Sequence, residues 1–154
     1  MQEGERTYSI VLRTSQSDIP DTLRRTFDGI EKEFGNTRLG MNVKDKKFVP
    51  FELALDITVK VASGVAISLV IKLLERLWDE FRRKKAVPEI QGMDGIQGTA
   101  ESYLKAIGVK EFKLMKRQDK GPYVTFAFED EIGNRHTLLV TSFDLKILRY
   151  ERME

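Results

Sequence analysis

The stretch FELALDITVKV, residues 51–61, decides how the first half of the chain is interpreted. Its apolar residues take every second position from Phe51 to Val61, and polar residues such as Asp56 and Lys60 stand between them. Successive side chains of a strand point to opposite faces of a sheet, whereas on a helix these apolar residues would scatter around the axis. The stretch therefore predicts a strand with one buried face.

The segment before this strand predicts two further strands and a helix. Residues 6–14 and 37–43 both alternate between apolar and polar positions, as half-buried strands do. Between them, Pro20 suits the first turn of a helix and Gly35 suits its end. The apolar residues of that helix are spaced as a single buried stripe: Leu23, Phe27, Ile30 and Phe34.

The segment after the strand predicts a second helix, capped by Ser63, and a short edge strand at residues 87–91 that contains Pro88. The predicted buried stripe of this helix consists of Ala66, Leu69, Val70, Leu73, Leu74, Leu77, Trp78 and Phe81. Its predicted solvent face consists of Lys72, Glu75, Arg76, Asp79, Glu80, Arg82 and Arg83. The order β-α-β-β-α-β predicts a ferredoxin-like module over residues 1–92.

The second half of the chain predicts a smaller module at residues 99–154. Residues 92–98 hold three glycines and are interpreted as a linker, because they fit neither a P-loop nor a dinucleotide-binding fingerprint. A helix is expected at residues 99–107, followed by an antiparallel meander of three or four strands. The predicted fold class of the whole chain is α+β.

Composition excludes several kinds of site. The chain has no cysteine and one histidine, His136, so disulfides, thiolate metal sites and histidine-rich metal sites are excluded. Its net charge of +2 is too small to indicate a nucleic-acid or membrane partner by itself. The most apolar stretch, residues 61–71, is too short to span a bilayer, and no secretory signal is visible. We expect a soluble, cytoplasmic protein without a metal or cofactor.

Few residues are candidates for catalysis. His136 alternates with Leu138 and Val140 on one strand face, which favours a packed structural histidine over a general base. The acidic turn at residues 129–131 is a candidate for a weak cation, although it lacks an EF-hand pattern. An enzyme is therefore less expected than a non-catalytic protein-interaction or regulatory module.

The start of the second helix is the candidate interaction surface, because it is apolar on more sides than one sheet can cover. The partner is expected to be another protein or a second copy of the chain; in the alternative interpretation, the second module covers this surface. Gly64 and Ser68 lie one turn apart and permit close approach of another element. The candidate residues are Gly64, Val65, Ile67, Ser68 and Ile71.

A nucleic-acid-associated accessory protein is the alternative function. Its candidate surface is the lysine-rich hairpin at residues 110–120, although Glu111 and Asp119 dilute the positive charge. The open sheet face of the first module lacks the aromatic residues that stack on RNA bases. The candidate cations are Lys110, Lys113, Lys116, Arg117 and Lys120.

Two segments resemble known families. Residues 99–151 resemble the PepSY module, with a short helix, the hairpin strand YVTFAFED at residues 123–130 and the closing segment DLKILRYE at residues 144–151. Lys146-Ile147 stands where that family usually has a glycine-containing turn. The resemblance implies a module that binds or inhibits rather than catalyses, in a family that is mostly extracytoplasmic. Residues 55–83 resemble small effector-associated components of bacterial defence systems.

Overall fold

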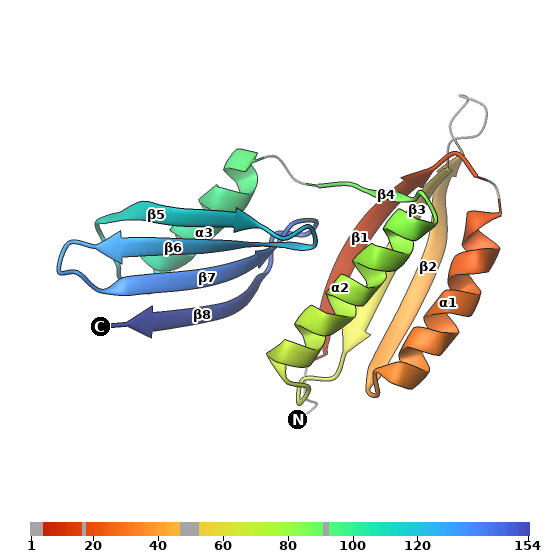
Figure 1. Cartoon of the computed structure of the whole chain (residues 1–154), viewed down its shortest axis with the longest axis horizontal. Helices are drawn as coiled ribbons and strands as arrows, with labels where there is room; N and C mark the ends of the chain where they lie inside the picture. The colour runs from red at the N-terminus through yellow and green to blue at the C-terminus, as the bar shows by residue number, and fades with distance from the viewer. Residues whose placement is uncertain (1–4, 17, 47–52, 91–92) are drawn as a thin grey trace. The chain divides into compact units, whose positions relative to one another are not determined.

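The computed structural model describes residues 5–16, 18–46, 53–90 and 93–154. The chain divides into two units, Met1–Glu89 and Ile90–Glu154, and each carries one four-stranded sheet (Figure 1). In the described part of the chain, no helix is both long and apolar enough to cross a membrane.

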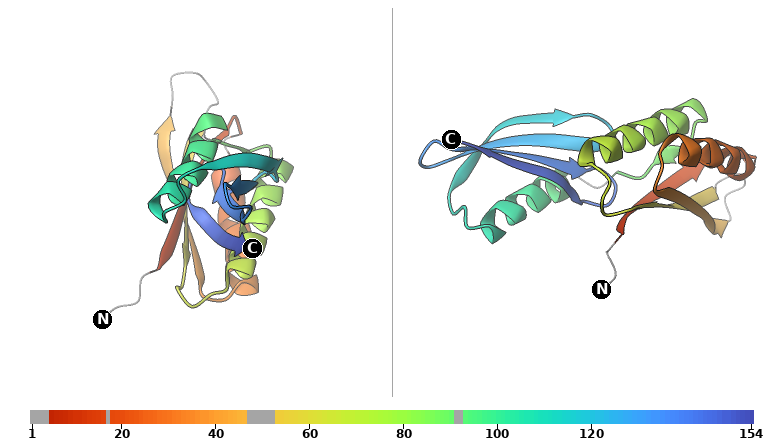
Figure 2. Two further views of the ribbon diagram at one scale, coloured as in Figure 1. Left: turned by 90° about the vertical axis from the view of Figure 1, so that its left-hand side faces the viewer. Right: turned by 90° about the horizontal axis from the view of Figure 1, so that it is seen from below.

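The first unit has the predicted ferredoxin-like fold. Its elements are β1 (Arg6–Thr14), α1 (Ile19–Glu33), β2 (Thr37–Lys46), β3 (Leu53–Val61), α2 (Ile67–Arg83) and β4 (Val87–Pro88). The sheet order is β2-β3-β1-β4, all neighbours are antiparallel, and β4 lies at the predicted edge. Both helices cover the same face of the sheet (Figures 1 and 2). Residues 51 and 52 of the predicted third strand lie outside the described residues.

The core of this unit lies between the sheet and its two helices. The alternation that predicted β1 and β3 is confirmed, because Leu12 and Ile57 are both 0% exposed while Ser9 and Lys60 face solvent. Register pairing places Ile10 opposite Ile57 on the buried face. The helices contribute a buried stripe each: Leu23, Phe27 and Ile30 from α1, and Val70, Leu73, Leu74, Leu77 and Phe81 from α2.

Helix α2 departs from the prediction at both ends. It begins at Ile67 after Ala66 in an extended conformation and has no side-chain cap, so the predicted Ser63 cap is wrong. Ala66 and Leu69, predicted as buried, face solvent, and Leu69 is 47% exposed. Glu80, predicted as solvent-facing, is only 4% exposed. Glu80 follows the buried Leu73 by seven residues, which is about 20° short of two full helical turns. The two side chains therefore lie on the same side of α2.

The second unit is a helix packed on an antiparallel meander, as predicted. It consists of α3 (Met93–Ala106), β5 (Phe112–Asp119), β6 (Tyr123–Asp130), β7 (Arg135–Thr141) and β8 (Ile147–Met153), with the strands in chain order across the sheet. Its core joins three small or apolar residues of α3 to the inward face of β6 and β7: Ile96, Ala100, Leu104, Val124, Phe126, Phe128, Leu138 and Val140.

The start of α3 corrects the predicted linker. The helix begins at Met93, so Gly95 and Gly98, interpreted as linker residues, lie inside it; Gly92 is outside the described residues. A glycine in a helix interior costs about 1 kcal/mol relative to alanine. Ile96 is 2% exposed in the core of the unit, and burying a residue of this size contributes about 1.5–3 kcal/mol. Burial of Ile96 therefore offsets the cost of the glycines beside it.

Candidate functional site

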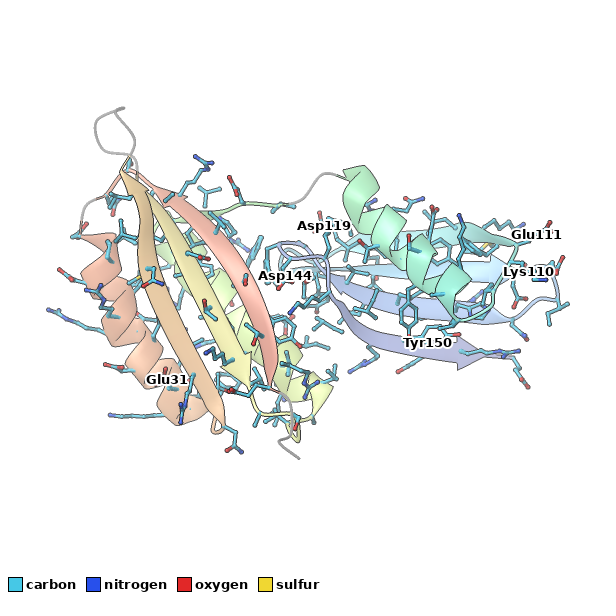
Figure 3. All side chains as sticks on the ribbon, turned by 180° about the vertical axis from the view of Figure 1, so that it is seen from behind. Glu31, Lys110, Glu111, Asp119, Asp144 and Tyr150 are labelled. Carbon is cyan, nitrogen blue, oxygen red and sulfur yellow. The ribbon has the colours of Figure 1, made fainter. Side chains whose placement is uncertain are left out.

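His136 lies on the buried face of β7 and contacts two polar side chains. The residue is 1% exposed, and the register of the sheet places it between Phe128 of β6 and Arg152 of β8. Its Nε2 atom lies 2.9 Å from Asp130 Oδ2, and its Nδ1 atom lies 2.7 Å from the Tyr150 hydroxyl oxygen. Tyr150, labelled in Figure 3, stacks on the imidazole with 5.9 Å between ring centroids.

The neutral imidazole satisfies both contacts in one arrangement of protons. An ionised carboxylate can only accept hydrogen bonds, so Nε2–H donates to Asp130 and Nδ1 accepts the hydrogen of the Tyr150 hydroxyl. The other oxygen of Asp130 accepts the backbone N–H groups of Ile132 and Asn134, at 3.1 and 2.9 Å. These hydrogen bonds, led by the one from His136, lower the pKa of Asp130, and burial raises the pKa of Tyr150.

The hydrogen bonds of His136, Asp130 and Tyr150 suit a structural role better than a catalytic role in proton transfer. A tyrosine that acts as a nucleophile or base needs a lowered pKa, whereas burial raises the pKa of Tyr150. Both imidazole nitrogens are already occupied, and both oxygens of Asp130 accept hydrogen bonds from the protein. The network therefore ties the β6–β7 turn to β8, which supports the interpretation of His136 as a structural histidine.

Sequence reasoning missed the two partners of His136. The sequence offers Asp130 only as part of an acidic turn that is a candidate for a weak cation, whereas in the structure the imidazole and the turn's own N–H groups donate hydrogen bonds to both its oxygens. Among the described residues, no group of three or more acidic or histidine side chains is arranged to hold a metal ion. Tyr150 is brought to His136 by the pairing of β7 with β8, which spacing along the chain does not reveal.

A hollow opens at the end of the second unit beside this network. Asp130 and His136 contribute to its wall, and Lys110 and Arg152 bring two cations to it. Figure 3 labels Lys110 and Glu111 at this end of the unit. Ile107 and Ile132, 44% and 75% exposed, add apolar surface to the lining. The lining of the hollow thus combines cations, acids and apolar groups. It does not favour one class of ligand.

The five candidate nucleic-acid cations do not share one face of the sheet. Lys113 and Lys116 pair with Glu129 and Ala127, which puts them on the face of β5 away from α3. Arg117 pairs with Phe126 on the other face, where its guanidinium lies 5.2 Å from the ring centroid. Lys110 lines the hollow described above, and Lys120 lies in the β5–β6 turn. The strand therefore does not present a continuous basic surface.

The candidate protein-interaction residues lie together where α2 begins. Gly64 and Ser68 are exposed, and Val65, Ile67 and Ile71 are half-buried. Arg6 fixes the preceding loop by donating from Nη2 to the backbone oxygen of Val65. Only Ile67, Ser68 and Ile71 belong to the helix; Gly64 and Val65 lie in the loop before it, so the predicted spacing of Gly64 and Ser68 by one helical turn is wrong.

Searches for similar proteins found no matching family model, curated protein or solved structure, so the PepSY resemblance stays a prediction.

Proposed function

We propose that the chain is a protein-interaction module that binds another protein, or a second copy of itself, through the flank of α2 that carries Ile67 and Ile71. The observation that supports this proposal is that the first two turns of α2 are apolar on three sides. Val70 is 0% exposed against the sheet, Leu69 is 47% exposed on one flank, and Ile67 and Ile71 are half-buried on the other.

Helical geometry separates the two flanks. Each residue advances a helix by about 100°, so Leu69 and Ile71 point in directions about 160° apart. Leu69 shares its side with Arg76, whose Nε lies 3.8 Å from Glu33 of α1. The flank with Leu69 therefore faces α1, and the flank with Ile67 and Ile71 faces away from it.

The flank away from α1 has the features of a contact surface. Ser68 lies beside the two isoleucines on the helix, and Gly64 lies in the loop before it; both are small and exposed, which allows the backbone of a partner to approach closely. Apolar groups left partly in water favour association when a partner removes them from it. The nucleic-acid alternative has less support, because the cations of residues 110–120 are divided between the two faces of β5.

The test places a lysine on each flank of the same helix. Ile71→Lys and Ser68→Lys should weaken association by about 2 kcal/mol, because a charge would be enclosed at the contact. Leu69→Lys is the matched control, with the same added charge on the opposite flank. Light scattering over a range of concentrations measures self-association, and a photo-crosslinking residue at position 71 or 69 captures other partners in cells.

Two outcomes would contradict the proposal. One is a full-length chain that stays monomeric at high concentration and forms no crosslink at position 71 that is absent at position 69. The other is equal loss of association in Leu69→Lys and Ser68→Lys. Ser68 is exposed, so its variant separates a binding effect from the loss of stability that Ile71→Lys brings at a half-buried position.

A further inference from the structure

The open face of the first sheet carries two cations directly opposite each other. Arg38 of β2 and Lys60 of β3 are register partners, and both are exposed. Like charges in this position repel and destabilise a pair of strands. In the described part of the chain, neither cation forms an ion pair with a carboxylate. An anion between them would remove the repulsion.

A hollow lies next to this pair. Residues 38–42 of β2 line it together with Thr58 and Lys60 of β3. Gly40, which lines the hollow, stands opposite Thr58, and a Cβ atom on it would come 4.0 Å from the Thr58 Cβ atom. The absence of a side chain at position 40 therefore leaves room beside the two cations.

The groups around the hollow favour an anion with several oxygen atoms. Arg38 and Lys60 can only donate hydrogen bonds, and the Thr58 hydroxyl and the Asn42 amide add further donors. Two acids lie nearby: Asp56 pairs with Asn42 two rows along the face from the Arg38–Lys60 pair, and Glu5 lines an adjoining hollow with Arg38. Asp56 thus makes the Asn42 end of the hollow less favourable for an anion than the end that holds Arg38 and Lys60.

We propose that this face binds the phosphoryl group of a small phosphorylated molecule between Arg38 and Lys60. A guanidinium binds two phosphate oxygens at once and an ammonium a third, which leaves the hydroxyl and amide for the remainder of the ligand. The register places no aromatic side chain on this face of β1, β2 and β3, so bases of a nucleic acid would find no stacking partner. The site lies on the sheet face opposite α1 and α2, so it is independent of the proposed α2 interface.

The test uses the full-length chain labelled with ¹⁵N and titrated with pyrophosphate. The amide signals of Gly40 and Thr58 should shift and saturate, while sodium chloride at matched ionic strength should leave them in place. Arg38→Gln and Lys60→Gln should each weaken binding about tenfold, the effect of losing one charged hydrogen bond. Lys32→Gln and Arg25→Gln remove exposed cations of α1 and should leave the affinity unchanged.

Three results would overturn the proposal. Equal shifts with chloride would mean general screening, and equal weakening by the α1 variants would mean attraction by overall charge. A single-stranded oligonucleotide that binds more tightly than pyrophosphate would identify a nucleic acid as the ligand instead of a small molecule. Unchanged amide signals from Ile57 and Val59 in the two variants would confirm that the sheet is intact.

Discussion

The two units enclose an acidic side chain by different means. Glu80 of α2 is held by Arg76 and Arg83, whose nitrogens lie 2.6 and 3.0 Å from its Oε1 atom. Asp130 at the end of β6 is held by a histidine and two backbone N–H groups. Both acids are nearly excluded from water, with side chains 5% and 11% exposed.

The difference lies in the partners. Arg76 and Arg83 are 37% and 69% exposed, so they keep contact with water while they reach an acid on the buried side. His136 is 1% exposed and has no alternative partner in water. The hydrogen bond to Glu80 also raises the pKa of Arg76. An acid with little exposure to water can thus be held by solvent-exposed cations or by a network of buried groups, and the two should respond differently to mutation.

The largest expected effect comes from Leu73, an apolar residue on the same side of α2 as Glu80. Its loss gives the reference value for a fully buried position on this helix. Leu73 is 1% exposed in the core of the first unit. Leu73→Ala should lower the free energy of unfolding by about 2–5 kcal/mol, through lost burial and a cavity. Urea denaturation at neutral pH measures it. A loss below 1 kcal/mol, on the scale of a surface substitution, would mean that α2 is rotated from the orientation described.

The second effect concerns the helical acid itself. Glu80→Ala should cost about 1–2 kcal/mol, because it removes charge-assisted hydrogen bonds from two arginines that can still hydrate. The matched control is Asp21→Ala in α1, which breaks the exposed pair with Arg24 and should cost at most about 0.5 kcal/mol. Denaturation of both variants at low and high salt measures the difference. Equal losses that salt abolishes in both would show that Glu80 behaves as a surface residue.

Much of the fold was predictable because its strands and helices differ in period. The strand predicted at residues 6–14 has the same bounds as β1, and the β-α-β-β-α-β order gave the sheet topology. The burial of Glu80 was not predicted, because a charged residue type favours the solvent face. Its spacing of seven residues from Leu73 nevertheless indicates the buried side. The start of α3 was not predicted, because Gly95 and Gly98 favour a linker. The helical spacing of Ile96, Ala100 and Leu104 indicates a helix instead.

The polar network of the second unit could not be derived from spacing. The strand pattern predicts His136 on the buried face, where it lies, but its partners depend on the register of β7 with β8 and on the turn after β6. The same limit applies to Arg38 and Lys60, which lie 22 positions apart in the chain and become neighbours only through strand pairing. Side-chain chemistry is visible in a sequence, whereas side-chain proximity across a sheet is not.

A smaller loss of stability is expected when Asp130 is replaced, and this loss should depend on pH. The folded pKa of Asp130 is lowered, so its contribution is present above the unfolded value of about 4 and is lost as pH falls through the folded value. Asp130→Asn should therefore be less stable than the wild type at neutral pH, and the difference should shrink in acid. The difference is measured from the unfolding free energies of both proteins between about pH 7 and about pH 2. The contributions of the other carboxylates are the same in both proteins and cancel in the difference. A difference that stays constant with pH would contradict the role of the carboxylate.

The smallest expected effect compares two glutamates on one helix. Glu75 is exposed and lies about 140° around α2 from Glu80. Glu75→Ala should change the free energy of unfolding by no more than about 0.5 kcal/mol, because an ion pair on an exposed face contributes little. The same substitution at position 80 should cost more, although the side chain removed is identical and both positions stay helical. The difference between the two losses therefore measures what the buried position and its two arginine hydrogen bonds add. Equal losses at both positions would show that helix propensity or net charge produces the effect, and would remove the basis for treating Glu80 as a buried acid.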